Sequence, residues 1–126
     1  MTATTTATVT VTIISIFSKW PGPEGKLAGR DQNVEYSVEV PAGETPEATL
    51  NAAYALTNMD DRPLGNKVCS TSAGDIMVLD GQHYFVDWEG FKKLTPKQST
   101  AIQALTSRDT GMGWDWLVKH NNISNS

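Results

Sequence analysis

The sequence predicts an α+β fold, with a small, mainly antiparallel sheet of about four strands and two helices packed on one face. Three observations support this prediction. Two segments in the first third of the chain alternate between apolar and polar residues with the period of a strand. Two later segments carry a proline at the first position of a helix. An Asp-Gly pair between two apolar runs marks a tight hairpin. The expected order is β-β-α-β-β-α, followed by a short helical turn.

The first strand is expected to run from Thr8 to about Trp20. Its first six residues alternate threonine with valine or isoleucine, which is typical of a half-buried strand. The polar side turns apolar at Ile14 and Ile16, so we expect the end of this strand to be covered on both faces. Pro-Gly-Pro at 21–23 then ends the strand.

Residues 33–40 form the clearest half-buried strand of the sequence. Apolar side chains at the even positions alternate with Glu35, Ser37 and Glu39. The two glutamates are therefore expected to face solvent. The Pro-Ala-Gly run at 41–43 ends the strand.

Helices are predicted from their start signals. Thr45-Pro46-Glu47 supplies a capping hydroxyl, a proline and an acid at the positive end of the helix dipole, and the alanines that follow support a helix to about Asn58. Thr95 and Gln98 have the spacing of a capping box. After two glycines that interrupt the second helix, the segment from Trp114 to Lys119 is expected to form a short terminal helix.

A long connection and a hairpin separate the two main helices. Residues 58–74 form the connection, and connections this long inside a small domain are usually functional or ordered by local contacts. Asp80-Gly81 predicts a type I′ turn between a strand at 76–79 and a return strand at 83–88. We interpret Gly90-Phe91 as a turn that follows the hairpin.

Length and composition restrict the class of protein. The 126 residues, 39% hydrophobic and 19% charged, suit one globular domain over 1–126, with flexible ends at 1–7 and 120–126. No segment reaches the run of about 20 apolar residues that crosses a bilayer, so no membrane association is expected. The start lacks the basic region of a signal peptide, and we expect a cytoplasmic protein of a bacterial host cell.

Few side chains suit a metal or a covalent mechanism. The single cysteine excludes an intramolecular disulfide framework and a CxxC zinc site. The chain has two histidines, and no metal or other cofactor is expected. Hydroxyls and the thiol gather at 69–72 without a nucleophile-elbow motif. Local turn hydrogen bonds explain this cluster better than catalysis does, although a small hydrolase that uses the 60–75 loop stays open as an alternative.

The negative charge is concentrated in the first half of the chain. The net charge is −4, and residues 1–63 carry four basic and eight acidic side chains, so 4 − 8 = −4. This balance argues against direct nucleic-acid binding. An ordinary solvated face explains it, and so does an acidic surface that meets a basic partner. The acidic candidates for partner binding are Glu35, Glu39, Glu44, Glu47, Asp60 and Asp61.

The Trp114-Asp115-Trp116 run has two interpretations. In the first, Trp114 fills the core and Trp116 caps the sheet. In the second, both tryptophans form an aromatic patch for a protein partner, because tryptophan is enriched at interface hot spots. Trp114 and Trp116 are therefore further candidates for partner binding.

Part of the chain resembles a known family. The segments 61–63, 69–81, 84–87 and 90–94, with Ala-Ala-Tyr-x-Leu-Thr-Asn at 52–58, are similar to the Ser-x-Ser-x-Gly-Asp…Tyr…Asp…Gly-Phe pattern of small YodL-like domains. The resemblance implies an accessory protein of a phage, plasmid or other bacterial mobile element and assigns no catalytic residue. In this pattern Ser70 and Ser72 cap a tight turn. Gly74 permits the backbone conformation of the turn, and Asp75 holds the turn together.

The leading hypothesis is a small acidic phage or mobile-element accessory protein that acts by binding a host or phage protein. An inhibitor of a host defence system, similar to an anti-CRISPR protein, fits the size and the acidity. Its partner is then expected to carry a basic nucleic-acid-binding surface. The alternatives are the hydrolase named above and a regulatory module of a conjugation system.

Overall fold

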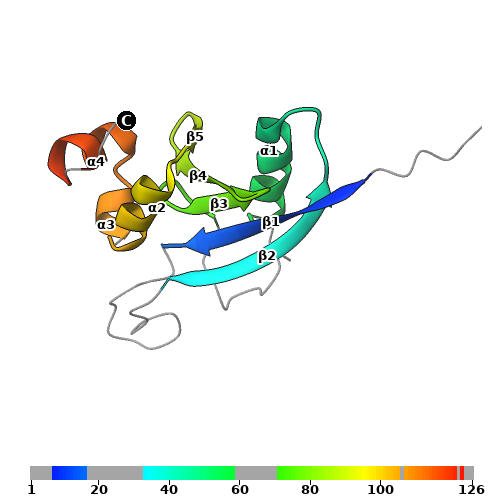
Figure 1. Cartoon of the computed structure of the whole chain (residues 1–126), viewed down its shortest axis with the longest axis horizontal. Helices are drawn as coiled ribbons and strands as arrows, with labels where there is room; N and C mark the ends of the chain where they lie inside the picture. The colour runs from blue at the N-terminus through cyan, green and yellow to red at the C-terminus, as the bar shows by residue number, and fades with distance from the viewer. Residues whose placement is uncertain (1–6, 17–32, 59–70, 106, 122, 124–126) are drawn as a thin grey trace, which may run out of the picture.

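The described part of the chain has the predicted α+β class, with five strands rather than about four (Figure 1). A computed structural model describes residues 7–16, 33–58, 71–105, 107–121 and 123. All neighbouring strands pair antiparallel in the order β2-β1-β3-β4-β5. Along the described chain the elements are β1 (Thr8–Ser15), β2 (Val34–Pro41), α1 (Pro46–Leu56), β3 (Ile76–Leu79), β4 (Gln82–Asp87), β5 (Gly90–Lys93), α2 (Pro96–Gln103), α3 (Ser107–Thr110) and α4 (Trp114–His120).

The fifth strand corrects the interpretation of Gly90-Phe91 as a turn. Both residues belong to β5, where Phe91 pairs with Val86 and Gly90 pairs with Asp87. The reversal is made by Trp88 and Glu89, which lack the Asn-Gly or Asp-Gly signature of a two-residue hairpin. At the other hairpin the signature is present, and Asp80 and Gly81 take the positive φ values of 51° and 78° that a type I′ turn requires.

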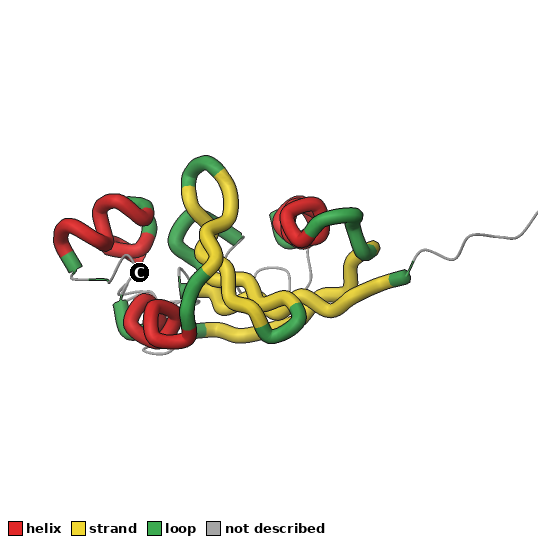
Figure 2. Tube along the Cα trace, turned by 45° about the horizontal axis from the view of Figure 1, so that its top comes forward, coloured by secondary structure: helices red, strands yellow, loops and turns green. Residues whose placement is uncertain are grey.

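Helices cover both faces of the sheet, so the prediction that they pack on one face was wrong. Successive side chains of a strand point to opposite faces. In β1, Val11 and Ile13 join a buried cluster with Leu50 of α1, whereas Ile14 joins a second cluster with Ile102 of α2. Figures 1 and 2 show α1 over one end of the sheet and α2, α3 and α4 gathered at the other.

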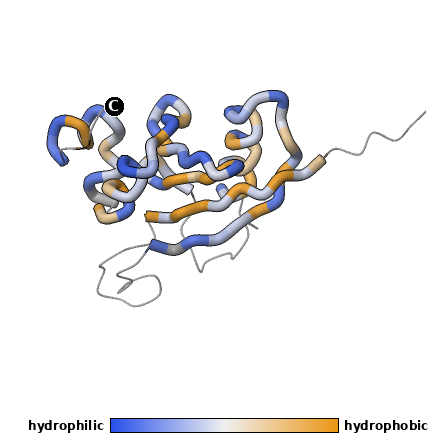
Figure 3. Tube along the Cα trace, viewed as in Figure 1, coloured by the Kyte–Doolittle hydropathy of each residue, from blue (hydrophilic) through white to orange (hydrophobic). Residues whose placement is uncertain are grey.

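The burial of β1 and β2 follows their sequence patterns. Ile13, Ile14 and Ile16 are all buried, so the end of β1 is covered on both faces as expected. In Figure 3 the hydrophobic positions are concentrated in the inner strands β1 and β3. On the edge strand β2, Val38 and Val40 are buried, and Glu39 between them is exposed.

Local signals also account for the helix starts. The side chain of Thr45 accepts a hydrogen bond from the Ala48 N–H at 3.1 Å. Thr95 and Gln98 form the predicted reciprocal capping box. The short helix α4 is present as expected, but the single turn α3 lies in a segment that the sequence suggested only as a break. Ile123, after α4, is buried in the second cluster.

Candidate functional site

A tight turn at 72–75 forms one wall of the candidate site. The Asp75 N–H donates to the Ser72 carbonyl at 3.0 Å, and Gly74 between them has a φ of +104°. The Asp75 carboxylate is buried, with 1% exposure, and accepts hydrogen bonds from the N–H groups of Ser72 at 2.9 Å and Ile16 at 2.8 Å. Asp75 therefore holds the turn through the Ser72 N–H and also links it to Ile16, the residue that follows β1.

Gly74 also brings the turn against the end of α3. A Cβ at this position would lie 2.7 Å from the carbonyl carbon of Thr110 and 2.8 Å from the Gly111 nitrogen. Such distances are too short for a side chain. Two separate features therefore require glycine at position 74: the positive φ of its backbone and the close approach of the Thr110 and Gly111 backbone.

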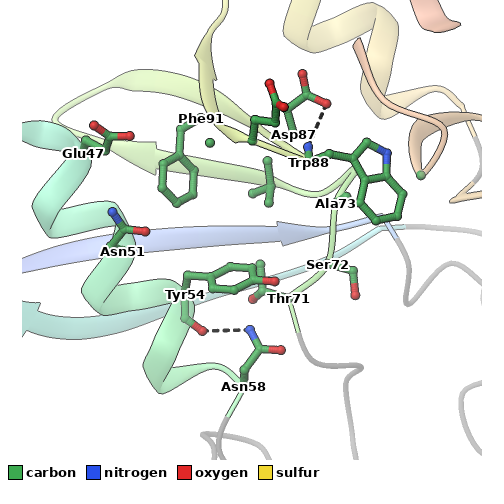
Figure 4. A pocket seen from close by; sticks show the side chains of 14 residues that line it. Glu47, Asn51, Tyr54, Asn58, Thr71, Ser72, Ala73, Asp87, Trp88 and Phe91 are labelled. Carbon is green, nitrogen blue, oxygen red and sulfur yellow. Dashed lines mark hydrogen bonds between the residues drawn. The ribbon is translucent and has the colours of Figure 1, made fainter. Parts of the chain in front are cut away.

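Next to this turn lies a groove of about 760 Å³ between α1 and the β4–β5 turn. Helix α1 contributes positions that recur on one helical face, namely Glu47, Asn51, Tyr54 and, just beyond its end, Asn58. Figure 4 shows Glu47 at one end, Trp88 at the other, and the rings of Phe91 and Tyr54 between them. The remaining described lining residues are Thr71, Ser72, Ala73, Val86, Asp87, Glu89, Gly90 and Gly111.

The groove combines aromatic rings with negative charge. Trp88 is 72% exposed and Tyr54 is 37% exposed, which makes them two of the largest apolar side chains at the surface. Carboxylates come from Glu47, Asp87 and Glu89. None of the described residues that line the groove is a lysine, arginine or histidine. The described lining therefore presents π-faces and three carboxylates, with no basic side chain among them, to whatever enters the groove.

Hydrogen bonds hold the Trp88 turn in place. Asp87 Oδ1 accepts from the N–H of Trp88 at 2.9 Å and from the N–H of Trp114, the first residue of α4, at 3.3 Å. The indole packs against Gly113, where a Cβ would lie 2.9 Å from Trp88 Cδ1. The exposed indole of Trp88 therefore belongs to a turn whose backbone is held by the hydrogen bonds to Asp87.

The predicted acidic residues do not form one surface. Glu47 lines the groove, and Glu44 is exposed in the connection before α1. Glu35 and Glu39 project from the exposed side of β2, where Thr8 and Thr10 hydroxyls donate to the Glu39 carboxylate. This side of β2 faces away from the cluster that contains α1. Asp60 and Asp61 lie outside the described residues.

The two tryptophans of the Trp-Asp-Trp run are placed differently from each other. Trp114 is 6% exposed and packs edge-on against Phe85, with ring centroids 5.9 Å apart and Lys92 Nζ 5.0 Å from its ring. Trp116 is half-buried, and its ring stacks on His120 at 3.9 Å. The prominent exposed tryptophan in the described part of the chain is Trp88, which the sequence placed at the end of the predicted return strand at 83–88. Because the turn signal at 88–89 is weak, the sequence offered little to separate Trp88 from that strand.

The hydroxyl and imidazole groups are spread over separate sites. His83 Nδ1 and Ser99 Oγ are hydrogen-bonded at 2.6 Å beside a small pocket of about 200 Å³, but Ser99 is only 1% exposed. In the groove, the Thr71 hydroxyl pairs with that of buried Thr57 at 2.6 Å, and Ser72 lies in the lining. His83 and Ser72 therefore line different pockets. Cys69 and Ser70 fall outside the described part of the chain.

Within the described ranges, no group of three or more His, Cys, Asp or Glu side chains could hold a metal ion. No helix in that part of the chain has the length and apolarity to cross a bilayer. Neither a family model, nor a curated protein, nor a solved structure matches the chain.

Proposed function

We propose that this protein acts by binding another protein and that the groove between α1 and the β4–β5 turn is the contact surface. The observation that carries the proposal is Trp88, an indole that is 72% exposed on a hydrogen-bonded turn beside Tyr54. Tryptophan and tyrosine dominate the energetics of protein interfaces, and exposed apolar side chains with a polar rim mark interaction sites.

The resemblance supports the biological setting of this proposal. Segments that carry it meet at the groove: Tyr54 and Asn58 from the end of α1, Thr71–Ala73 from the turn, and Asp87 and Phe91 from the second hairpin. We therefore propose a phage or mobile-element accessory protein that works in the bacterial cytoplasm. Inhibition of a host defence system, in the manner of an anti-CRISPR protein, is the specific form that its acidity favours. Its target then has a basic nucleic-acid-binding surface.

Matched charge reversals separate the groove from the acidic side of β2. The double variants Glu47→Lys/Glu89→Lys and Glu35→Lys/Glu39→Lys each raise the net charge from −4 to 0, and all four glutamates are exposed. The tagged proteins are incubated with bacterial lysate, and each captured protein is quantified. We expect the groove variant to lose a partner that the β2 variant and the wild type retain. Retention by the groove variant contradicts the groove as the contact surface.

A small hydrolase is the second candidate, because Ser72 and three carboxylates share the groove. The wild type and Ser72→Ala are assayed on chromogenic esters and glycosides. Turnover by the wild type that Ser72→Ala abolishes would establish the enzyme and overturn the binding proposal as the whole function. A regulatory module of a conjugation system is a further setting in which the same binding groove would operate.

A further inference from the structure

We infer that the groove binds an extended segment of the partner that carries an arginine, with the guanidinium on the Trp88 indole beside the carboxylate of Glu89, the next residue of the turn, and with Glu47 adding negative charge at the other end of the groove. This inference rests on the proposed protein-binding function and specifies the chemistry of the partner. It depends on the charge of the groove, on its exposed rings and on its fixed geometry.

Charge favours a cationic occupant. Three carboxylates line the groove and no described lining residue is basic. An acidic peptide or a phosphate backbone would be repelled. A neutral oligosaccharide could stack on the rings and pair with the amides, but it would leave the carboxylates without a counter-charge.

The rings favour arginine over lysine. A cation over an aromatic face is stabilised, and tryptophan is the best partner for it. The chain uses this contact internally, where Lys92 Nζ lies 5.0 Å from the Trp114 ring, whereas the Trp88 ring is 72% exposed. Guanidinium is planar, so it can stack on the indole while its N–H groups donate to a carboxylate in a bidentate pair.

The polar wall of α1 suits a peptide backbone. Asn51 and Asn58 lie on the same side of the groove as Glu47 (Figure 4). The Asn58 amide nitrogen donates to the Tyr54 carbonyl at 2.8 Å, which fixes that side chain and leaves its oxygen as an acceptor. The Asn51 amide supplies a donor and an acceptor. Together these groups can pair with the N–H and C=O groups of an extended chain.

The binding surface is preorganised, which lowers the entropic cost of association. Asp87 Oδ1 holds the backbone of the turn through two N–H groups, and Gly113 supports the indole. We assign Asp87 a positioning role and leave the contact with the guanidinium to Glu89, whose exposed carboxylate follows Trp88 in the turn, while exposed Glu47 adds negative charge at the other end of the groove.

The test uses the ¹⁵N-labelled full chain and a capped peptide of sequence Gly-Ser-Gly-Arg-Gly-Arg-Gly-Ser-Gly. The four tryptophans provide indole N–H signals, and the signal of Trp88 is the one that Trp88→Phe removes. We expect the arginine peptide to shift the Trp88 signal and to leave that of buried Trp114 in place. A peptide with citrulline in place of arginine keeps the shape without the charge and should bind at least about tenfold more weakly.

Matched neutral variants locate the contact. The double variant Glu47→Gln/Glu89→Gln should bind the arginine peptide about tenfold more weakly than the wild type. Glu35→Gln/Glu39→Gln makes the same change on β2 and should keep the affinity for this peptide within about twofold.

Equal binding of the citrulline peptide overturns the inference, and so does a Trp88 shift caused by cellohexaose but not by the arginine peptide. If Trp88→Ala abolishes capture of the lysate partner while the arginine peptide fails to bind, the protein-binding function stands and the arginine inference is wrong. If the peptide binds as expected but the groove variants capture the same lysate proteins as the wild type, the proposed function fails instead.

Discussion

Asp87, the last residue of β4, caps helix α4: its Oδ1 accepts a hydrogen bond from the Trp114 N–H, 27 residues away, at 3.3 Å. The residue at the N-cap position itself is Gly113, which has no side chain to make that bond. The same oxygen accepts from the Trp88 N–H. One carboxylate thus joins the start of α4 to the turn that carries the exposed indole.

The first prediction concerns this cap. Asp87→Ala removes the acceptor and should lower the free energy of unfolding by about 1 kcal/mol, because two backbone N–H groups lose their partner. Urea denaturation followed by circular dichroism measures the change. Asp115→Asn is the control, since Asp115 is an exposed acid in the first turn of α4 and makes none of these cap hydrogen bonds. Equal midpoints for Asp87→Ala and the wild type would refute the capping role.

The second prediction separates backbone strain from steric overlap at two glycines. Gly74 and Gly81 both have a positive φ, but a Cβ at Gly81 meets nothing within 4 Å, whereas at Gly74 it meets backbone atoms of Thr110 and Gly111. Gly81→Ala should destabilise the fold by about 1 kcal/mol. Gly74→Ala should add about 1–3 kcal/mol to that loss. The urea midpoints of the two variants test this ranking. If the Gly74→Ala protein is as stable as the Gly81→Ala protein, the turn at Gly74 is not in close contact with the end of α3.

The third prediction tests whether the sheet is buried on both faces. Leu50 on α1 and Ile102 on α2 are both fully buried, each in a different cluster. Leu50→Ala and Ile102→Ala should each reduce the free energy of unfolding by about 2–5 kcal/mol. Met112→Ala, at a half-exposed position, should cost under about 0.5 kcal/mol. A negligible effect at either buried site would mean that its helix does not pack on the sheet.

The fourth prediction concerns the capping box of α2. The Thr95 side chain accepts from the Gln98 N–H at 3.1 Å, and the Gln98 side chain accepts from the Thr95 N–H at 2.8 Å. Thr95→Ala should destabilise the protein by about 1 kcal/mol. Thr100→Ala replaces an exposed threonine within the same helix and should change stability by less than about 0.5 kcal/mol. The thermal midpoints of the two variants should therefore differ, and coinciding midpoints would contradict the cap.

Features that depend on neighbours in sequence could be predicted well. The starts of α1 and α2 follow from Thr45 and Thr95, whose side chains bond within one turn of the helix. The hairpin at Asp80-Gly81 follows from the φ values that those residues tolerate. Period-two alternation in β2 correctly separated buried Val38 from exposed Glu39.

The candidate site could be predicted only in pieces. Glu47 was identified from its charge, but its neighbours in the groove come from β4, β5 and the turn at 72–75. Glu35 and Glu39 were grouped with Glu47 because they are close in sequence. In the structure the chain changes direction between β2 and α1, so the glutamates of β2 and the glutamate of α1 lie on different surfaces. The sequence could not show which of Trp88 and Trp114 is exposed, because their neighbours are alike. Each tryptophan is next to an acidic residue and has a glycine within two positions.

Local chemistry in this chain therefore specified the strands with clear alternation, the capped helices and the Asp-Gly turn, since each of these depends on contacts among residues a few positions apart. Long-range packing specified the rest: β5, the placement of helices on both faces, and the burial of Trp114 with the exposure of Trp88. These features depend on which surfaces meet after the chain has folded. The hydrogen bond between Asp87 and Trp114 is an example, because no spacing in the sequence indicates that these two residues lie side by side.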